Sequence, residues 1–282
     1  HRQTVPSDIS VLIRAGMNIE TIKSSQNHYR LASRSFNMAE LRLIISAIES
    51  SKFISKSKSK QLITKVSKLA GADWENELRR TVSVEGRIKV NNEKIFEIVA
   101  AIHSAIVTGS KVSFRYCAYR KSKKKEFTND GVPYVISPYD LVWNGDNYYV
   151  IGWSDQHNEL RTFRVDRIYD VPMEINEQAA EKPADYNLDE WINTTFHMFH
   201  SPRETVELLC KNDVINAIMD KFGEKVDYAK VDDEHFRIRV KVAVNNIFYS
   251  WVFGFGGKVK ILSPENVKDG YKQMLQDACE NV

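Results

Sequence analysis

A chain of 282 residues is too long for one ordinary core, and its 43% of apolar residues allows two or three small domains to be packed. With 40 basic and 37 acidic residues the net charge is only +3, so charge alone does not require a nucleic-acid partner. The 3 cysteines are widely spaced, which argues against a disulfide framework and a cysteine zinc site. Short apolar stretches and a polar start predict a soluble, cytoplasmic protein without a membrane helix or signal peptide.

The first 36 residues predict a short helix followed by a two-stranded ribbon. Helix-start residues precede an apolar stripe with helical spacing, and a glycine follows. These are Thr4, Pro6 and Ser7 for the start, Ile9, Leu12 and Ile13 for the stripe, and Gly16 for the end. Residues 19–22 and 28–31 are strand-like runs. A helix followed by a hairpin is typical of the second half of a winged helix-turn-helix, so we expect the chain to begin inside a DNA-binding domain.

Amphipathic helices are predicted over residues 37–52, 59–70 and about 92–107, the first of them capped by Asn37 or Ser35. No acidic residue interrupts the stretch from 50 to 72, which holds several lysines. They are Lys52, Lys56, Lys58, Lys60, Lys65 and Lys68. These lysines either face DNA phosphates or, as is commoner for such runs, form solvated helix faces.

From residue 111 onward, apolar residues recur with the two-residue period of β-strands instead of the period of a helix. Alternation predicts a strand over residues 111–119, and further strands are predicted near 132–143, 147–153 and 160–168. An Asn-Gly pair between the second and third of these runs is a strong hairpin signal. Several short strands at close spacing predict a small barrel.

Residues 172–202 have a mixed composition with three prolines and are predicted to form a linker with a short helix near 189–193. The tail then alternates strands and helices. The expected order is strand 204–210, helix 212–222, strands 225–230 and 235–243, helix 245–254, strand 257–262 and helix 264–280. This β-α-β-β-α-β order resembles a ferredoxin-like sandwich with an added helix.

Residues 136–168 resemble the WYL domain. The family's name triplet falls on Tyr148-Tyr149-Val150, and residues 161–168 match its Arg-x-Phe-Arg-x-Asp-Arg-Ile stretch closely. The flanks are similar to the family as well. Phe114-Arg115-Tyr116 fits its first barrel strand, Thr4 to Leu12 its recognition helix, Tyr29-Arg30-Leu31 its wing, and the tail after Pro202 its C-terminal extension.

The resemblance implies an α+β multidomain protein that acts as a transcriptional regulator. Its expected parts are a partial winged helix-turn-helix, a helical linker, a small SH3/Sm-like β-barrel, a second linker and a ferredoxin-like dimerisation extension. The corresponding ranges are 1–36, 37–107, 108–182, 183–202 and 203–282. The implied partners are a double-stranded DNA operator, an anionic nucleic-acid or nucleotide ligand, and a second copy of the chain in a homodimer.

The strongest candidate ligand site is the arginine-rich strand over residues 160–168. Guanidinium groups can hold a phosphate through paired hydrogen bonds while a nearby tyrosine ring stacks on a base. The candidate ligand-binding residues are Tyr116, Ser137, Tyr149, Arg161, Arg164 and Arg167. The alternatives are that Asp166 pairs with Arg164 or Arg167 in ordinary salt bridges and that Ser137 is only a polar residue at a strand end.

The candidate DNA-binding residues lie at the start of the first helix, because that end of a recognition helix reaches base edges. They are Arg2, Gln3, Thr4 and Ser7. The basic loop 120–125 could also hold a nucleic-acid backbone, although such a run is more often a solvated hairpin tip.

Catalytic and metal sites are not expected. Gly254–Lys258 lacks the spacing of a phosphate-binding loop and is predicted to be a helix-to-strand turn. His197 and His200 have no carboxylate or cysteine at ligand spacing. We therefore expect a regulator without cofactors rather than an enzyme. The alternatives are a nucleic-acid-processing enzyme and a protein-interaction module that uses the barrel surface.

Overall fold

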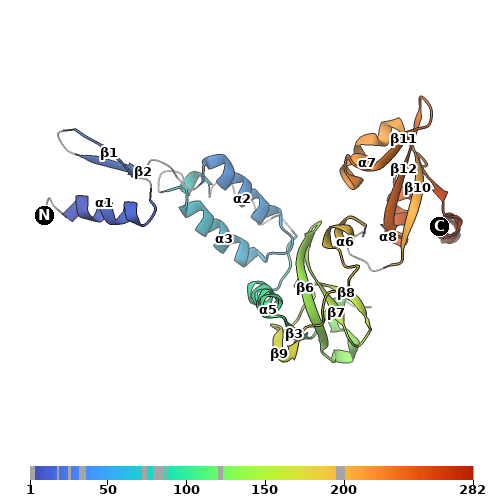
Figure 1. The fold of residues 1–282 in the computed structure, drawn as a ribbon, viewed down its shortest axis with the longest axis horizontal. Helices are drawn as coiled ribbons and strands as arrows, with labels where there is room; N and C mark the ends of the chain where they lie inside the picture. The colour runs from blue at the N-terminus through green and yellow to red at the C-terminus, as the bar shows by residue number, and fades with distance from the viewer. Residues whose placement is uncertain are drawn as a thin grey trace. The chain divides into compact units, whose positions relative to one another are not determined.

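The computed structural model describes residues 4–17, 19–24, 27–31, 36–71, 75–78, 86, 88–119, 123–194 and 201–281 (Figure 1). These residues divide into two compact units, His1–Glu93 and Lys94–Val282. Helices and small sheets occur in both, so the chain is α+β, as predicted. Within the described ranges, no helix combines the length and the apolar composition needed to cross a bilayer.

The first unit begins with the predicted helix and hairpin. Helix α1 spans Thr4–Arg14, and strands β1 (Ile19–Ile22) and β2 (His28–Leu31) pair antiparallel. Gly16 takes the left-handed backbone conformation (φ +91°) that ends a helix, as expected. None of the residues of α1 is buried, and Leu12 and Ile13 of its apolar stripe are exposed while Ile9 is half-buried.

Two capped helices follow, close to the predicted positions. Helix α2 (Met38–Ser50) begins at Asn37, whose side chain accepts the Glu40 N–H while the Glu40 carboxylate accepts the Asn37 N–H. Helix α3 (Lys56–Lys68) begins three residues earlier than predicted because Ser55 caps it. Their shared core consists of Leu41, Ile45, Ile63, Ala70 and Leu78.

The second unit opens with α5 (Ile95–Thr108), which packs against a five-stranded antiparallel sheet in the order β8-β7-β6-β3-β9. The strands of this sheet are β3 (Ser110–Phe114), β6 (Tyr134–Asn144), β7 (Asn147–Ser154), β8 (Glu159–Arg164) and β9 (Met173–Gln178). The helix contacts β6, β3 and β9 of this sheet. A two-residue turn at Gly145 joins β6 to β7, as the Asn-Gly signal predicted.

The prediction of one continuous strand over residues 111–119 is wrong, because strand β3 ends at Phe114. Strand β4 (Cys117–Tyr119) leaves the large sheet and pairs with β5 (Lys125–Phe127) in a separate hairpin. The carbonyl of Arg115 accepts the N–H of Tyr169, and the carbonyl of Tyr116 accepts the N–H of Thr128. These partners come from two other segments, which is why alternation within one strand did not reveal the break.

The predicted strand 160–168 is also shorter than expected. Strand β8 ends at Arg164, and Val165–Arg167 forms a turn of 3-10 helix. The expected shared face of Arg161 and Arg167 therefore does not exist, because strand alternation stops between them. Phe163 and Val165 are buried, as predicted.

The prediction that residues 172–202 form a linker is wrong for its first residues, because Met173–Gln178 form strand β9. Strand β9 lies at the edge of the large sheet and pairs with β3. Its side chains are mostly exposed and polar, so it carries no alternating apolar pattern. The short helix α6 (Leu188–Thr194) is confirmed, and its Trp191 packs on Val142, Tyr149 and Ile151 of the sheet.

The C-terminal part of the second unit forms the predicted sequence of elements. It comprises β10 (Arg203–Lys211), α7 (Ile215–Phe222), β11 (Asp227–Lys230), β12 (His235–Ala243), α8 (Asn246–Phe253), β13 (Val259–Ser263) and α9 (Glu265–Glu280). The sheet order is β11-β12-β10-β13, and all neighbouring strands are antiparallel. Alternate residues of β10 and β12 fill its core, among them Val206, Leu208, Phe236 and Ile238.

The three cysteines occupy contrasting environments, which predicts different thiol reactivity. Burial raises the pKa of Cys210 to about 12 and also raises that of Cys117, whereas Cys279 is exposed on α9. Because the thiolate is the reactive form, we expect a disulfide reagent at pH 8 to modify Cys279 rapidly and the other two only on unfolding. The Cys279→Ser variant should lose the rapid phase, and rapid modification of all three thiols would contradict the buried cores.

Candidate functional site

Four of the six predicted ligand residues lie together where β8 ends. The β7–β8 register places Tyr149 directly opposite Arg164. Tyr116 accepts a hydrogen bond from the backbone N–H of Arg164 at 3.1 Å. The 3-10 turn brings Arg167 close enough for its charge to act on both phenols. We call these four residues the arginine–tyrosine cluster.

Asp166 is the counter-ion inside this cluster. Arg164 donates from Nε and Nη2 to its two carboxylate oxygens at 3.0 and 2.9 Å. The carboxylate side chain is only 6% exposed and that of Arg164 26%, so this paired geometry is held away from water. The pairing that the sequence left open between Arg164 and Arg167 therefore involves Arg164.

Arg167 is the cation of the cluster that has no counter-ion within the described part of the chain. Its side chain is half-buried. Burial raises the pKa of both Tyr116 and Tyr149, and the Arg167 charge offsets this only in part. Both phenols are therefore neutral at pH 7 and can donate hydrogen bonds. An uncompensated guanidinium beside neutral phenols favours an anion.

The two tyrosine rings are packed into the protein. Tyr149 is buried and packs with Trp191 of α6, and its phenol forms a hydrogen bond with Asn147. Tyr116 makes edge-to-face contacts with Tyr134 and Phe163. Tyr149 therefore offers no free ring face to a base, whereas the half-buried Tyr116 keeps part of its ring exposed. Their phenol oxygens remain as polar groups of the cluster.

Asn147 is a residue of the cluster that the sequence reasoning missed. It stands two positions before Tyr149 in the same strand, so both side chains lie on one face. That spacing is a usable signal, because a polar residue two positions from a buried tyrosine can satisfy its phenol.

The other two predicted ligand residues lie elsewhere. Arg161 donates to Glu159 at 2.9 Å, and it is three positions from Arg164 in β8, so the two point to opposite faces of the sheet. Ser137 is fully buried, and its hydroxyl accepts the backbone N–H of Ala180 at 2.9 Å. Ser137 therefore joins β6 to the segment after β9 and offers no surface to an anion.

The predicted DNA-binding residues are only partly within the described chain. Arg2 and Gln3 lie outside the described residues. Thr4 and Ser7 lie in the first turn of α1 and are both exposed. They are therefore accessible on the helix that the sequence predicts to be the recognition helix.

The residues of the metal and phosphate-loop alternatives are described only in part. His197 and His200 lie outside the described residues, and among those described no group of three or more metal-binding side chains occurs. Gly254–Lys258 forms the turn between α8 and β13, as predicted, with positive φ at Gly256 and Gly257.

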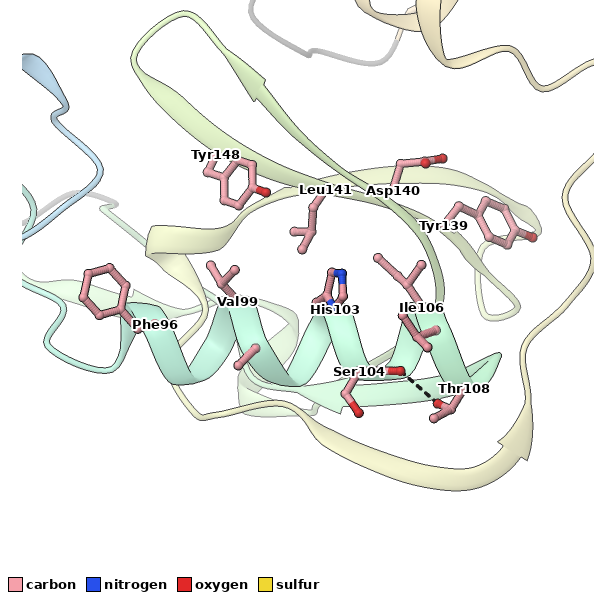
Figure 2. A pocket seen from close by; sticks show the side chains of 12 residues that line it. Phe96, Val99, His103, Ser104, Ile106, Thr108, Tyr139, Asp140, Leu141 and Tyr148 are labelled. Carbon is pink, nitrogen blue, oxygen red and sulfur yellow. Dashed lines mark hydrogen bonds between the residues drawn. The ribbon is translucent and has the colours of Figure 1, made fainter. Parts of the chain in front are cut away.

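A groove of about 780 Å³ runs along α5, away from the six predicted ligand residues (Figure 2). The side chains of Val99, His103 and Ile106 point from the helix towards Leu141 and Tyr148 of the sheet. Its lining is mainly apolar, unlike the arginine–tyrosine cluster. The sequence reasoning missed this groove because α5 is apolar on nearly every side, so its stripe did not distinguish a buried face from an exposed one.

Comparison with protein families assigns both parts of the second unit. Residues 97–173 match the WYL domain and residues 202–279 match the WCX domain. The first match covers most of α5, the strands β3, β6, β7 and β8, and all four residues of the arginine–tyrosine cluster, whereas β9 lies almost wholly beyond its end. The chain therefore carries a WYL domain followed by a WCX domain. This confirms the resemblance of residues 136–168 to the WYL domain.

Two solved structures are similar over most of the chain. The proteasome accessory factor B/C (PafBC) of Arthrobacter aurescens is 17% identical, with 99% of this chain and 40% of that chain covered and a TM-score of 0.33. A CRISPR Cas-related protein is 10% identical, with 89% and 75% covered and a TM-score of 0.42. This chain thus spans well under half of the PafBC chain. No curated protein matches it, so the family assignment rests on the two domain matches.

Proposed function

We propose that this protein is a DNA-binding transcriptional regulator whose WYL domain senses an anionic ligand, either single-stranded nucleic acid or a nucleotide. The observation that carries the proposal is the half-buried Arg167, which has no counter-ion in the described chain and lies beside two neutral phenols. Binding there modulates operator binding. The protein acts without catalysis or a cofactor.

The finer domain assignments belong to this proposal. We assign the five-stranded sheet to a small SH3/Sm-like barrel, an assignment supported by its strand order β8-β7-β6-β3-β9 and by the 3-10 turn before the last strand. We assign the four-stranded sheet and its helices to a ferredoxin-like dimerisation domain, supported by the order β11-β12-β10-β13. We assign α1 and the β1–β2 hairpin to the recognition helix and wing of a winged helix-turn-helix.

The cluster suits a phosphate group for three reasons. Among the described residues Arg167 has no ion-pair partner, so its planar guanidinium can donate to two phosphate oxygens. Arg164 is held rigid by Asp166, so little side-chain entropy is lost when its remaining N–H groups donate. The phenol of Tyr116 accepts from a backbone N–H and keeps its own proton for donation.

The test is calorimetric titration with a nucleoside monophosphate and with a 5′-phosphorylated trinucleotide. Arg167→Ala removes a charged donor, so we expect the affinity to fall at least about tenfold. Arg161→Ala is the matched control, because Arg161 faces the other side of the sheet and should change the affinity less than about twofold. Equal losses in both variants, or no binding by the wild type, would contradict the site.

Ligand binding regulates the protein only if the ligand prefers one state of the dimer. We propose two states with different affinities for DNA, with the operator an inverted repeat whose half-sites are separated by whole helical turns. Lys and Arg contacts to phosphates make this affinity fall steeply with salt. The alternative function is that of a nucleic-acid-processing enzyme, and turnover of a labelled oligonucleotide would favour this alternative over a regulator.

The exposed apolar groove along α5 favours a second candidate function, the docking of a protein partner. Val107 on its rim is largely exposed. A contiguous apolar surface of this kind is typical of interaction sites. If Val107→Lys abolished operator binding without changing nucleotide affinity, docking at this groove would be the better explanation.

A further inference from the structure

One face of the four-stranded C-terminal sheet is open to a partner. Helices α7, α8 and α9 pack on the other face, where they share a core with the even-numbered residues of β10 and β12. Side chains alternate along a strand, so the odd-numbered residues point away from that core. In 205–211 and 235–241 they are exposed or half-buried. We call these odd-numbered residues, together with Asp227 and Ala229 of β11 and Lys260 and Leu262 of β13, the open sheet face.

Cations outnumber carboxylates on the open sheet face. The cations are Lys211, Arg237, Arg239, Lys241 and Lys260, and the carboxylates are Glu207 and Asp227. Arg237 pairs with Glu207 at 2.9 Å. Arg239 and Lys260 are exposed, and neither forms an ion pair with a residue that the structure describes. The face therefore carries uncompensated positive charge, which attracts an acidic partner.

Apolar side chains alternate with the cations across the strands. The register places Ala229 opposite Arg237, Arg237 opposite Leu209, and Leu209 opposite Lys260. Because neighbouring strands lie about 4.8 Å apart, the two cations of this row are about 10 Å apart with a leucine between them. Leu262 is 39% exposed and extends the apolar area on β13. A hollow of about 180 Å³ lies beside the two arginines of β12 and can receive a partner's side chain.

An acidic segment of this chain already contacts one end of the open sheet face. Residues 185–191 read Asp-Tyr-Asn-Leu-Asp-Glu-Trp and include part of helix α6, which contacts β12. Glu190 accepts a hydrogen bond from the Lys241 ammonium at 2.5 Å. Beside it, the guanidinium carbon of Arg203 lies 4.4 Å from the centre of the Trp191 ring. The contact combines a carboxylate on a cation with an apolar side chain next to it, which is the chemistry that the rest of the face offers.

We propose that the open sheet face, centred on Arg237, Arg239 and Lys260, binds an acidic amphipathic segment of a partner protein. Carboxylates of the partner pair with the cations, while its apolar side chains cover Leu209 and Leu262. Recognition of acidic motifs by clustered cations is a recurring mode of peptide binding, and charge complementarity gives it specificity and speed. The site is independent of any ligand bound at the arginine–tyrosine cluster.

Two other occupants fit the open sheet face less well. A second copy stacked on it face to face would bring like charges together, which is unfavourable. Among its residues, all of which the structure describes, no Phe, Tyr or Trp is present to stack on a base. The register also places Glu207 and Asp227 directly opposite Arg239, and these carboxylates would repel a phosphate backbone. A polypeptide whose carboxylates are separated by apolar residues satisfies both the cations and the leucines.

The test is fluorescence anisotropy of the full chain with a labelled peptide of about 20 residues that repeats glutamate and leucine at helical spacing. Arg239→Glu/Lys260→Glu should lower the affinity at least about tenfold, because two attractive contacts become repulsive. Since neither side chain has an ion-pair partner in the described chain, this variant should keep the wild-type thermal midpoint. Lys225→Glu/Lys272→Glu is the matched control. It makes the same change of charge at exposed positions off the face, and at about 0.15 M salt it should change the affinity less than about threefold.

Leu262→Gln tests the apolar part of the surface without changing its charge, and it should weaken peptide binding at least about threefold. The proposal is overturned if the wild-type chain does not bind the peptide, or if Arg239→Glu/Lys260→Glu binds it as tightly as the control. It is also overturned if an oligonucleotide duplex or polyglutamate competes as well as the peptide, because nucleic acid or charge alone would then explain binding.

Discussion

Replacing Phe163 by alanine is expected to lower the free energy of unfolding by about 3–5 kcal/mol. Phe163 is 4% exposed, and its ring contacts Phe114, Tyr116 and Tyr134 edge to face at centroid distances of 5.0 to 5.3 Å. Truncation therefore loses the burial of a large ring and leaves a cavity among three other aromatic side chains. Urea unfolding followed by tryptophan fluorescence measures the change.

The matched control is Phe253→Ala, because Phe253 is 59% exposed at the end of α8. It should cost less than about 1 kcal/mol, as is usual for exposed positions. The same variants bear on function, since Tyr116 packs on Phe163 and also hydrogen-bonds Arg164. A Phe163→Ala protein as stable as Phe253→Ala would contradict the aromatic core beneath the cluster.

Gly152→Ala is the second substitution with a large expected effect. A Cβ atom at Gly152 would lie 2.6 Å from the carbonyl oxygen of Ser137 and 3.2 Å from the Cα of Pro138. Both atoms are backbone of the paired strand β6, so the clash is relieved only by separating two central strands. We expect a loss of about 2–3 kcal/mol of unfolding free energy, the upper part of the range for overpacked cores.

Gly254→Ala provides the comparison for this glycine. Its Cβ would meet its nearest neighbours at 3.4 and 3.5 Å, and its backbone is already helical with φ −57°. Stability should therefore change by less than about 0.5 kcal/mol. Equal thermal midpoints for the two alanine variants would show that β6 and β7 do not approach each other as closely as the structure has them.

Much of the fold follows from local sequence patterns. The helices and strands from residue 203 onward match the prediction closely because their apolar residues alternate or recur with clear periods, as in β10 and β12. Strand β9 could not be predicted in this way, since as an edge strand it buries little and owes its place to hydrogen bonds with β3. The end of strand β3 before Arg115 likewise depends on backbone hydrogen bonds to residues more than 10 positions away in the chain.

The candidate site was predictable in composition but not in geometry. The sequence indicates Arg164, Arg167, Tyr116 and Tyr149, and the structure places these four together. It does not indicate that the 3-10 turn at Val165–Arg167 redirects Arg167, because such a short turn has no distinct pattern. Arg161 belongs to the same motif and yet lies on the opposite face, since strand alternation separates neighbours in sequence.

The most direct test of the arginine–tyrosine cluster is NMR of the arginine Nε–Hε groups during titration with a nucleoside monophosphate. The signals of Arg164 and Arg167 should shift together and saturate with one binding constant, while those of Arg161 and Arg115 stay unchanged. Tyr116→Phe should weaken the titration without moving the site. Shifts confined to Arg161, or to residues of the α5 groove such as His103, would contradict the claim that this cluster binds the ligand.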